Sequence, residues 1–342
     1  MTYYQKSQKP TSTSQIFPLC QNNLFTDTIS SIDGFQYNNA YCFGCTSWDK
    51  SLRAFFVQNP QSITLAAEQH IPEPITSLCV VAQMFVIGTA GGNLGLWDLQ
   101  KNQITPLHQF TDAVVSIKYI ESVQSLVVAS LDGSLGLYDI RAGRMNLMNI
   151  GGKIVQMDAK DELIAYSTPG KLEIFNLATQ KNESAMRLST TSNVNNSVQS
   201  IAFFPDKQGV IFGSVDGRVN VVTFGTKDNK KTYAFKAQHK KITQTQSTYF
   251  PVNALSFYNE SVFLTGGSDG IIHVWDKNKK SLINDLQSPI ANCAITSAKF
   301  ICNGSFLAFA VGNDYHKGCV SGVGNVENVP VIKIVDEPLV KS

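Results

Sequence analysis

The stretch "LTGGSDGIIHVWDKNKKS", Leu264 to Ser281, carries the strongest structural signal in the chain. Apolar and polar residues alternate on both sides of an Asp-Gly pair, and the second run closes on Trp275 and Asp276. Asp-Gly supplies the positive φ that a tight hairpin turn needs, and alternation of period two indicates a strand with one buried face. The stretch therefore predicts two antiparallel strands joined by a short turn.

This hairpin pattern occurs six times in the 342 residues. In each copy an aromatic or branched apolar residue closes the second strand six positions after the turn residue. The turn and closing residues form the pairs Asp49 and Phe55, Gly91 and Trp97, Asp132 and Tyr138, Pro169 and Phe175, Asp216 and Val222, and Asp269 and Trp275. The copies lie about 37 to 53 residues apart, near the ~40–45-residue period of a four-stranded propeller blade.

Further strand–turn–strand segments lie between the hairpins, so each repeat unit contains four short strands. A seventh unit, residues 295–335, lacks the Asp-Gly turn and offers only three strands. The N-terminal "QIFPL", residues 15–19, is expected to supply the fourth and to remove the free sheet edge. The sequence therefore predicts an all-β fold. It is one seven-bladed β-propeller over residues 15–342, closed by an N-terminal strand that completes the last blade, behind a disordered polar tail over residues 1–14.

The composition narrows the class of protein. The net charge of +2 and the pI of about 8.1 exclude a strongly basic wrap around a phosphate backbone. The seven cysteines are odd in number and scattered, and residues 1–14 are polar. No apolar run approaches the ~20 residues that a membrane helix needs. We therefore expect buried thiols in a reducing intracellular compartment and no membrane contact.

The candidate catalytic and metal-binding motifs lack a supporting context. Cys42 and Cys45 form a Cys-x-x-Cys pair, but zinc needs four ligands and no second pair lies near. "GGSDG", residues 266–270, matches the Gly-x-Ser-x-Gly of a nucleophile elbow around Ser268. That motif needs a strand that runs into a helix, and here a second strand follows. We expect a non-enzymatic scaffold, without metal or cofactor, whose loops hold partners.

The repeat resembles that of the WD-repeat family. Trp97-Asp98 and Trp275-Asp276 reproduce the signature dipeptide of that family. The resemblance implies a WD-repeat β-propeller. His70 and His108 precede strand starts where the family commonly places a buried histidine. We expect both to be structural braces rather than bases or metal ligands.

The second half of the chain resembles one branch of that family more specifically. The segments that carry the resemblance are "PDKQGVIFGSVDGRVNV" (205–221), "KTYAFKAQHKK" (231–241), "YFPVNALSF" (249–257), "TGGSDGIIHVWDKNKK" (265–280) and "NGSFLAFAVGNDYHKG" (303–318). They are similar to the nuclear mRNA-export propellers of the Rae/Gle type and the spindle-checkpoint propellers of the Bub type. "TSWDKSLRAFFVQ" (46–58) fits the first blade of the same branch. The "YHKG" of the last segment favours the export type, whereas "DKQG" looks more like the checkpoint type, which stays the alternative.

Both types are implied to clamp a short partner segment with adjacent glutamates on one propeller face. The partner would be a nucleoporin for the export type, and a checkpoint kinase or kinetochore protein for the checkpoint type. Arg218 and Lys236 match the family's cations, and a guanidinium can take a carboxylate in a bidentate pair. Trp48 offers a flat aromatic anchor. The family's Lys-Cys-His-Arg reads "KAQHK" here, so the next basic residue has moved.

The export type is also implied to touch single-stranded RNA through a basic and aromatic strip on the same face. Phe235, Trp275, Lys277 and Lys280 match this strip, and stacking with cations is the chemistry that single strands need. "YDIR", Tyr138 to Arg141, resembles the Trp-Asp-x-Arg box of ubiquitin-ligase substrate receptors. The implied location is the nucleus and the nuclear envelope, or the mitotic kinetochore for the alternative, with a cytoplasmic pool.

Overall fold

The computed structural model describes residues 16–20, 24–59, 62–187, 198–224, 233–243, 246–316 and 327–341. The predicted polar tail, residues 1–14, lies outside these ranges. The chain packs as two compact units, and each is described by itself. One unit is Met1–Ile32 together with Phe204–Ser342, and the other is Asp33–Phe203. That residues 15–342 behave as a single domain stays a prediction.

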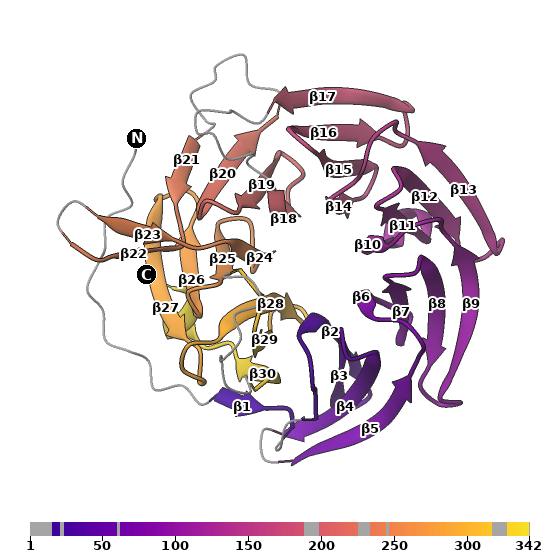
Figure 1. Ribbon diagram of the computed structural model, residues 1–342, viewed down its shortest axis with the longest axis horizontal. Coiled ribbons are helices and arrows are strands. Elements are labelled where there is room, and N and C mark those ends of the chain that lie inside the picture. Colours follow the sequence, from indigo (N-terminus) through magenta and orange to yellow (C-terminus); the bar gives the residue numbers. More distant parts are fainter. Residues whose placement is uncertain are drawn as a thin grey trace. The chain divides into compact units, whose positions relative to one another are not determined.

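The strands form seven four-stranded sheets, numbered here as blades in chain order (Figure 1). Blade 1 contains β2 (Ile29–Tyr37), β3 (Ala40–Ser47), β4 (Ser51–Asn59) and β5 (Ser62–His70). Blade 2 contains β6 (Ile75–Val81), β7 (Met84–Thr89), β8 (Asn93–Asp98) and β9 (Gln103–Gln109). Blade 3 contains β10 (Val114–Ile120), β11 (Ser125–Ser130), β12 (Ser134–Asp139) and β13 (Arg144–Asn149). Blade 4 contains β14 (Gln156–Lys160), β15 (Leu163–Thr168), β16 (Lys171–Asn176) and β17 (Lys181–Arg187).

The later blades follow the same scheme. Blade 5 contains β18 (Val198–Phe203), β19 (Gly209–Ser214), β20 (Arg218–Thr223) and β21 (Tyr233–Lys236). Blade 6 contains β24 (Val252–Phe257), β25 (Val262–Gly267), β26 (Ile271–Asp276) and β27 (Ser281–Gln287). Blade 7 contains β28 (Ala294–Ile301), β29 (Phe306–Gly312), β30 (Val329–Ile334) and β1 (Ile16–Pro18). The helices described are η1 (Glu121–Val123) and α1 (Glu337–Val340).

The hairpin predicted from the opening stretch is confirmed in blade 6. β25 and β26 pair antiparallel, with Phe263 opposite Trp275. Gly270 adopts φ of +76° in the turn, a conformation that costs glycine little. The Trp275 ring is buried, and its Nε1 donates a hydrogen bond to Thr265 Oγ1 at 3.0 Å. The closing tryptophan therefore ties the second strand of the hairpin to the first.

The predicted completion of the last blade is also confirmed. β1 pairs antiparallel with β30, and Phe17 lies opposite Ile332. The order within this sheet is β1, β30, β29 and β28, so a strand from the start of the chain covers the edge of a strand near its end. An exposed edge of β30 would otherwise be a template for pairing with another chain.

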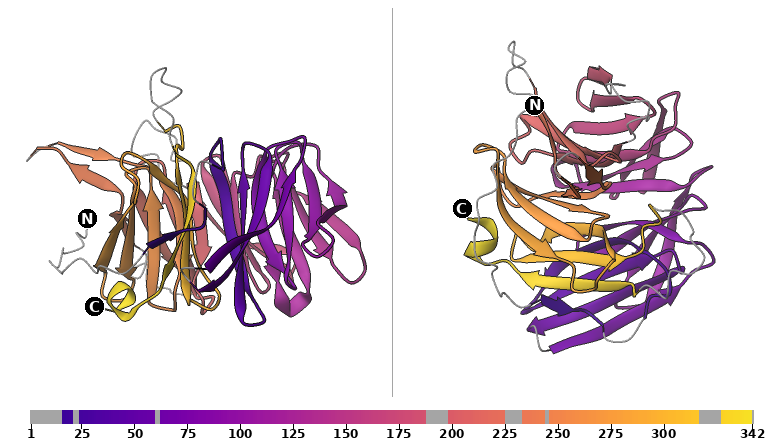
Figure 2. Two further views of the ribbon diagram at one scale, coloured as in Figure 1. Left: turned by 90° about the horizontal axis from the view of Figure 1, so that it is seen from below. Right: turned by 60° about the vertical axis from the view of Figure 1, so that its left-hand side comes forward.

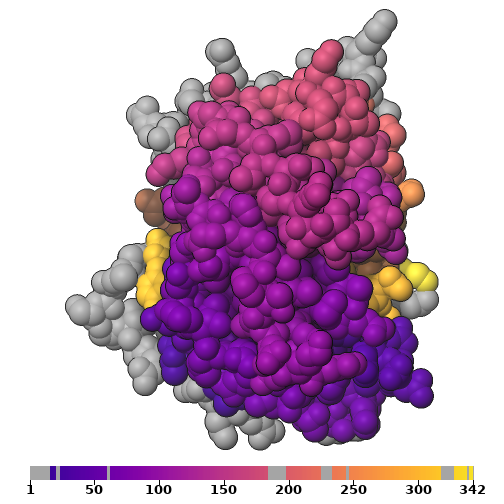
Figure 3. All heavy atoms as spheres, turned by 90° about the vertical axis from the view of Figure 1, so that its right-hand side faces the viewer, coloured from indigo at the N-terminus to yellow at the C-terminus, as the bar shows by residue number. Residues whose placement is uncertain are grey.

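Each unit has its own apolar core. In blades 6 and 7 the inward side chains of neighbouring strands, such as Leu264, Val274 and Phe309, are fully buried together. In blades 1 and 2 Trp97 and Phe85 are fully buried, with ring centroids 5.9 Å apart. The outer strands are more exposed, and β9 and β13 face the viewer in Figure 3.

One element is absent from the sequence-based prediction. A two-stranded sheet of β22 (His239–Lys241) and β23 (Ser247–Tyr249) lies between β21 and β24 in the chain. Figure 2 shows this hairpin projecting beyond the sheets of its unit. Among the described residues, no helix combines the length and the apolar character that a membrane crossing requires.

Candidate functional site

The two cations predicted to clamp an acidic segment lie side by side. Arg218 begins β20 directly after the Asp216-Gly217 turn, and Lys236 ends β21. The two residues are register partners across these antiparallel strands. Because directly opposite residues on neighbouring strands have Cβ atoms about 5 Å apart, both positive side chains start from one short stretch of blade 5.

The Arg218 side chain is paired with Asp216 and remains partly exposed to solvent. Its Nε lies 3.2 Å from Asp216 Oδ2, and 38% of the side chain is exposed. Ser214 donates its hydroxyl to the other oxygen of Asp216. Within the described part of the chain no residue pairs with the two terminal guanidinium nitrogens. These are the nitrogens that take a carboxylate in a bidentate pair, so Asp216 orients the group for an external acid.

Lys236 rests on an aromatic ring that the sequence-based prediction missed. Its Nζ lies 4.4 Å from the centroid of the Tyr249 ring and donates a hydrogen bond to the Tyr249 hydroxyl. Tyr249 is 38% exposed and stacks on His239. The cation–π contact limits the positions of the ammonium group. Tyr249 lies in β23, so no repeat signature marks it.

Trp48 belongs to the other unit, and this residue is 46% exposed. It lies in the β3–β4 turn, in which Lys50 has φ of +71°. The corresponding positive-φ residue of five other hairpins is a glycine, namely Gly92, Gly133, Gly170, Gly217 and Gly270. A non-glycine residue in this conformation is strained and persists only where its surroundings hold it.

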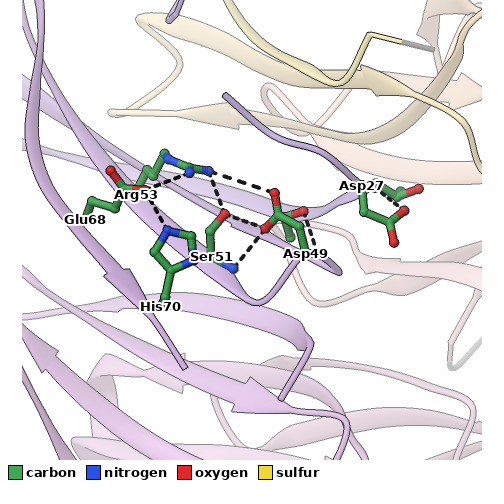
Figure 4. A network of polar contacts seen from close by, with 8 residues as sticks. Asp27, Asp49, Ser51, Arg53, Glu68 and His70 are labelled. Carbon is green, nitrogen blue, oxygen red and sulfur yellow. Dashed lines mark hydrogen bonds and ion pairs between the residues drawn. The ribbon is translucent and has the colours of Figure 1, made fainter. Parts of the chain in front are cut away.

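The surroundings of this turn are a buried polar network (Figure 4). Asp49 Oδ1 accepts hydrogen bonds from the backbone N and the hydroxyl of Ser51, at 2.9 and 2.5 Å. Arg53 donates to the Ser51 hydroxyl at 2.6 Å and to Glu68 at 2.7 Å. The network fixes the turn, so the exposed Trp48 ring is presented on a rigid support.

The four residues predicted to touch RNA divide into two pairs. Phe235 and Trp275 are buried, with ring centroids 4.9 Å apart. The structure thus places both rings in the core, so neither is available to stack on a base. The reason is that Trp275 closes the hairpin of blade 6 and packs against the strand that contains Phe235.

Lys277 and Lys280 instead line a cavity of about 460 Å³. Lys277 Nζ lies 3.7 Å from the centroid of Phe204, and Lys280 Nζ lies 4.4 Å from the centroid of Tyr233. Burial lowers the pKa of Lys277, while Asp206 and Glu260 oppose this shift. Phe204 and Tyr233 are further aromatic residues that sequence reasoning did not identify.

The two cationic clusters lie at different ends of one strand. Tyr233 begins β21, and its hydroxyl donates to the Lys277 carbonyl at 2.9 Å, whereas Lys236 ends the same strand. Four residues of strand span roughly 10 Å between their ends. The Lys277 cluster is therefore separate from the Arg218 and Lys236 pair.

The residues considered for catalysis or metal binding, Ser268, Cys42 and Cys45, are hydrogen-bonded or buried within the sheets. Ser268 donates its hydroxyl to Asp314, and His316 contacts the other oxygen of that carboxylate. The hydroxyl therefore bonds a carboxylate rather than an imidazole base. Cys42 and Cys45 are both buried in β3, where an odd spacing directs them to opposite faces. Within the described ranges, no group of three or more His, Cys, Asp or Glu residues is placed to hold a metal ion.

The predicted histidine braces and the "YDIR" segment also lie in the described part. The His70 ring is exposed and lies 2.9 Å from Glu68, and the His108 ring packs edge-on against Phe110. Asp139 Oδ1 accepts a hydrogen bond from the backbone N of Arg141 at 2.9 Å, which makes this segment a turn. Its role as a ligase contact stays a prediction.

Comparisons with known proteins agree with this architecture. The family described as "WD domain, G-beta repeat" matches residues 240–276. The structure titled "Structure of U3-55K" superposes with a TM-score of 0.73, at 14% identity, over 94% of this chain and 98% of that one. The "Crystal structure of RRP9 WD40 repeats" gives a TM-score of 0.72, at 15% identity, over 96% of this chain and 99% of the other. At these identities the likeness establishes the fold, a seven-bladed β-propeller.

Sequence relatives cover most of the chain. The "mRNA export factor GLE2" of Chaetomium thermophilum is 25% identical over 305 residues, 86% of this chain and 82% of that protein. The "Mitotic checkpoint protein bub-3" of Caenorhabditis elegans is 26% identical over 282 residues, 80% of each chain. The "Poly(A)+ RNA export protein" of Schizosaccharomyces pombe is 23% identical over 305 residues, 86% of this chain and 85% of that protein. The chain is thus a WD40-repeat β-propeller related to the Rae1/Gle2 mRNA export factors and the Bub3 checkpoint proteins.

Proposed function

We propose that this protein is a non-enzymatic scaffold that binds a short, glutamate-containing segment of a partner through Arg218 and Lys236. The observation that carries the proposal is the register pairing of these two residues on β20 and β21 of blade 5. Two adjacent cations match two adjacent carboxylates, and each charge-assisted bond is stronger than a neutral one. Asp216 and Tyr249 orient the pair for this task.

Trp48 is proposed as an aromatic anchor for the same partner. Exposed aromatic side chains on rigid turns are frequent binding hot spots, because they add contact area at a low entropy cost. The polar network around the strained Lys50 holds the turn in one conformation. Trp48 lies in the other unit, so the effect of its replacement on partner binding is the test of this role.

The partner class follows from the relatives. Several are mRNA export proteins, and others are mitotic checkpoint proteins, at similar identity. We propose mRNA export, with a nucleoporin segment as the ligand and the nuclear envelope as the location. The alternative is a checkpoint scaffold that binds kinase or kinetochore segments. The "YHKG" segment favours export; Lys317 and Gly318 of this segment lie outside the described residues.

A second candidate activity is the binding of single-stranded RNA at Lys277 and Lys280. Both ammonium groups lie over aromatic rings around one cavity. Cations beside aromatic surfaces are the features that sequence-independent single-strand binding uses. This candidate rests on Lys277, Lys280 and the partly exposed Tyr233, because Phe204 is as buried as Phe235 and Trp275.

Affinity purification of the tagged protein tests the proposal, followed by identification of the directly bound proteins. We expect a partner with adjacent glutamates in a short segment, and we expect the Arg218→Glu and Lys236→Glu double variant to lose it. A tagged protein at the nuclear rim in interphase supports export, and one at mitotic kinetochores supports the alternative. A folded double variant that retains its partners contradicts the clamp.

A further inference from the structure

Blades 1, 2 and 6 differ in the residue that they carry at one position of the repeat. It is the fourth residue after the turn residue, and it points to the same sheet face in each copy because the hairpins share one spacing. From blade 1 to blade 6 this position is occupied by Arg53, Gly95, Gly136, Glu173, Asn220 and His273. Two of the six residues are therefore potential cations, and two have no side chain.

In blades 1 and 6 the residue at this position is paired with carboxylates of its own blade. Arg53 lies 4.0 Å from the turn residue Asp49 and 2.7 Å from Glu68, its register partner in the outer strand (Figure 4).

The arrangement in blade 6 is the same in kind. His273 lies 3.8 Å from the turn residue Asp269 and 2.5 Å from Asp285, its register partner in the outer strand. A basic side chain thus joins the turn to the outer strand in both blades.

Blade 2 retains the carboxylate and lacks the cation. Its turn residue is Gly91, and the Glu73 carboxylate takes the place of a turn aspartate, since a Cβ on Gly91 would lie 2.3 Å from Glu73 Oε1. Thr89 and Asn93 donate side-chain hydrogen bonds to Glu73 Oε2 at 2.6 and 3.0 Å. These bonds lower the pKa of Glu73, so the carboxylate is ionised at neutral pH. The cation position is Gly95.

A cavity of about 220 Å³ opens beside Gly95. Its polar lining is Glu73 with the two residues that bond it, Thr89 and Asn93, and the remaining walls are mainly apolar, with Ile71, Ile87, Leu94, Ile104 and Pro106. This volume is below the range of drug-sized ligand sites and suits a single side chain. A long basic side chain buries its methylene stem on apolar walls and keeps its charged head at a polar rim.

We propose that this cavity in blade 2 binds one lysine or arginine side chain of a partner protein, with the stem among the apolar residues and the charged head on Glu73. The partner then supplies a basic side chain, as Arg53 and His273 do within their own blades. The site is independent of the acidic-segment clamp, because it recognises the opposite charge and its residues all lie in the unit that lacks Arg218 and Lys236.

Methyl-based NMR tests the proposal with two small probes and full-length protein labelled at its Ile and Leu methyl groups. The probes are N-acetyl-lysine methylamide and N-acetyl-norleucine methylamide, which have the same methylene stem and differ in the ammonium group. We expect the lysine probe to shift the methyl signals of Ile87, Leu94 and Ile104 and to bind about fivefold more tightly than the norleucine probe. Glu73→Gln keeps the shape of the side chain and should abolish this difference.

Glu121→Gln, at an exposed residue of η1, is the matched charge control and should retain the preference. Thermal unfolding of both variants establishes that they are folded. Should Glu73→Gln not fold, the comparison of the two probes on the unmodified protein still decides the question. Equal binding of the two probes, shifts confined to other methyl groups, or an unchanged preference in a folded Glu73→Gln protein would overturn the proposal.

Discussion

Arg218 and Lys236 are register partners on β20 and β21, and each is held by a neighbour, Asp216 for the guanidinium and Tyr249 for the ammonium. The hairpin turn before β20 and the projecting β22–β23 hairpin supply these two neighbours. The cationic pair is thus built where a regular blade meets an irregular insertion.

Two tryptophans with opposite burial test the role assigned to Trp48. Trp48→Ala should weaken binding of the acidic partner about tenfold, because an exposed aromatic anchor is lost, and should leave the unfolding free energy nearly unchanged. Trp97→Ala should cost about 3–5 kcal/mol of stability, because Trp97 is fully buried. Isothermal titration calorimetry and urea unfolding measure the two effects. An unaltered affinity of the Trp48→Ala protein would remove this residue from the site.

His273 should make stability depend on pH in the neutral range. Burial alone would lower its pKa, but the Asp269 and Asp285 carboxylates raise it. A raised folded-state pKa means that the protonated imidazole stabilises the fold below an unfolded pKa of about 6.5. This contribution is lost as the pH rises through the folded-state pKa. The stability cost of His273→Gln should therefore be larger at about pH 6 than at about pH 9, as measured by urea unfolding. A cost that increases with pH would contradict the assignment.

Asp132 should also make stability depend on pH, but its contribution should be lost as the pH falls rather than as it rises. Burial raises its pKa, but hydrogen bonds from Thr111 and Ser134 outweigh this and lower it to about 2. The stabilisation is present above the unfolded pKa of about 3.9 and disappears as the pH falls through the folded value. After allowance for solvent screening, Asp132→Asn should cost about 1 kcal/mol at neutral pH. The difference from the unmodified protein should diminish in acid unfolding curves, and a constant difference would argue against a charge effect.

Lys277 and Lys280, which lie close to Tyr233 at the start of β21, should contribute to the affinity for RNA. Lys277→Gln with Lys280→Gln should weaken binding of a labelled oligo(U) and reduce the slope of log affinity against log salt by about 1.4, since each cation accounts for about 0.7 on a single strand. Fluorescence anisotropy at several salt concentrations measures this slope. Lys279→Gln is the matched control, because Lys279 lies between them and its side chain is 61% exposed. Equal slopes for the double variant and the control would exclude this site.

The fold was predictable because its signals are local. A hairpin such as β25–β26 needs only an Asp-Gly turn, alternating side chains and a closing aromatic residue, all within one short stretch. The completion of blade 7 by an N-terminal strand was predictable by counting strands, because the last repeat unit offers only three. The two strands that pair, β1 and β30, lie at opposite ends of the chain.

The candidate site was less predictable because it depends on contacts between segments. Tyr249 reaches Lys236 only through the β22–β23 hairpin, which has no repeat signature. Phe235 matches the family by sequence, yet its burial against Trp275 depends on packing between blades 5 and 6. Sequence patterns mark residue types at the ends of strands, and packing decides which of these rings stay exposed.

The central claim, that Arg218 and Lys236 bind adjacent carboxylates, is tested most directly by a charge exchange. The measurement is the affinity of a labelled partner peptide with two adjacent glutamates for the unmodified protein and for the Arg218→Glu and Lys236→Glu double variant. The same two proteins are then titrated with the peptide in which both glutamates are lysines. We expect each mismatched combination to bind at least about tenfold more weakly, and the doubly exchanged combination to recover much of the affinity. Failure of the exchanged pair to recover, with both proteins folded, would contradict a direct contact between these cations and the partner's carboxylates.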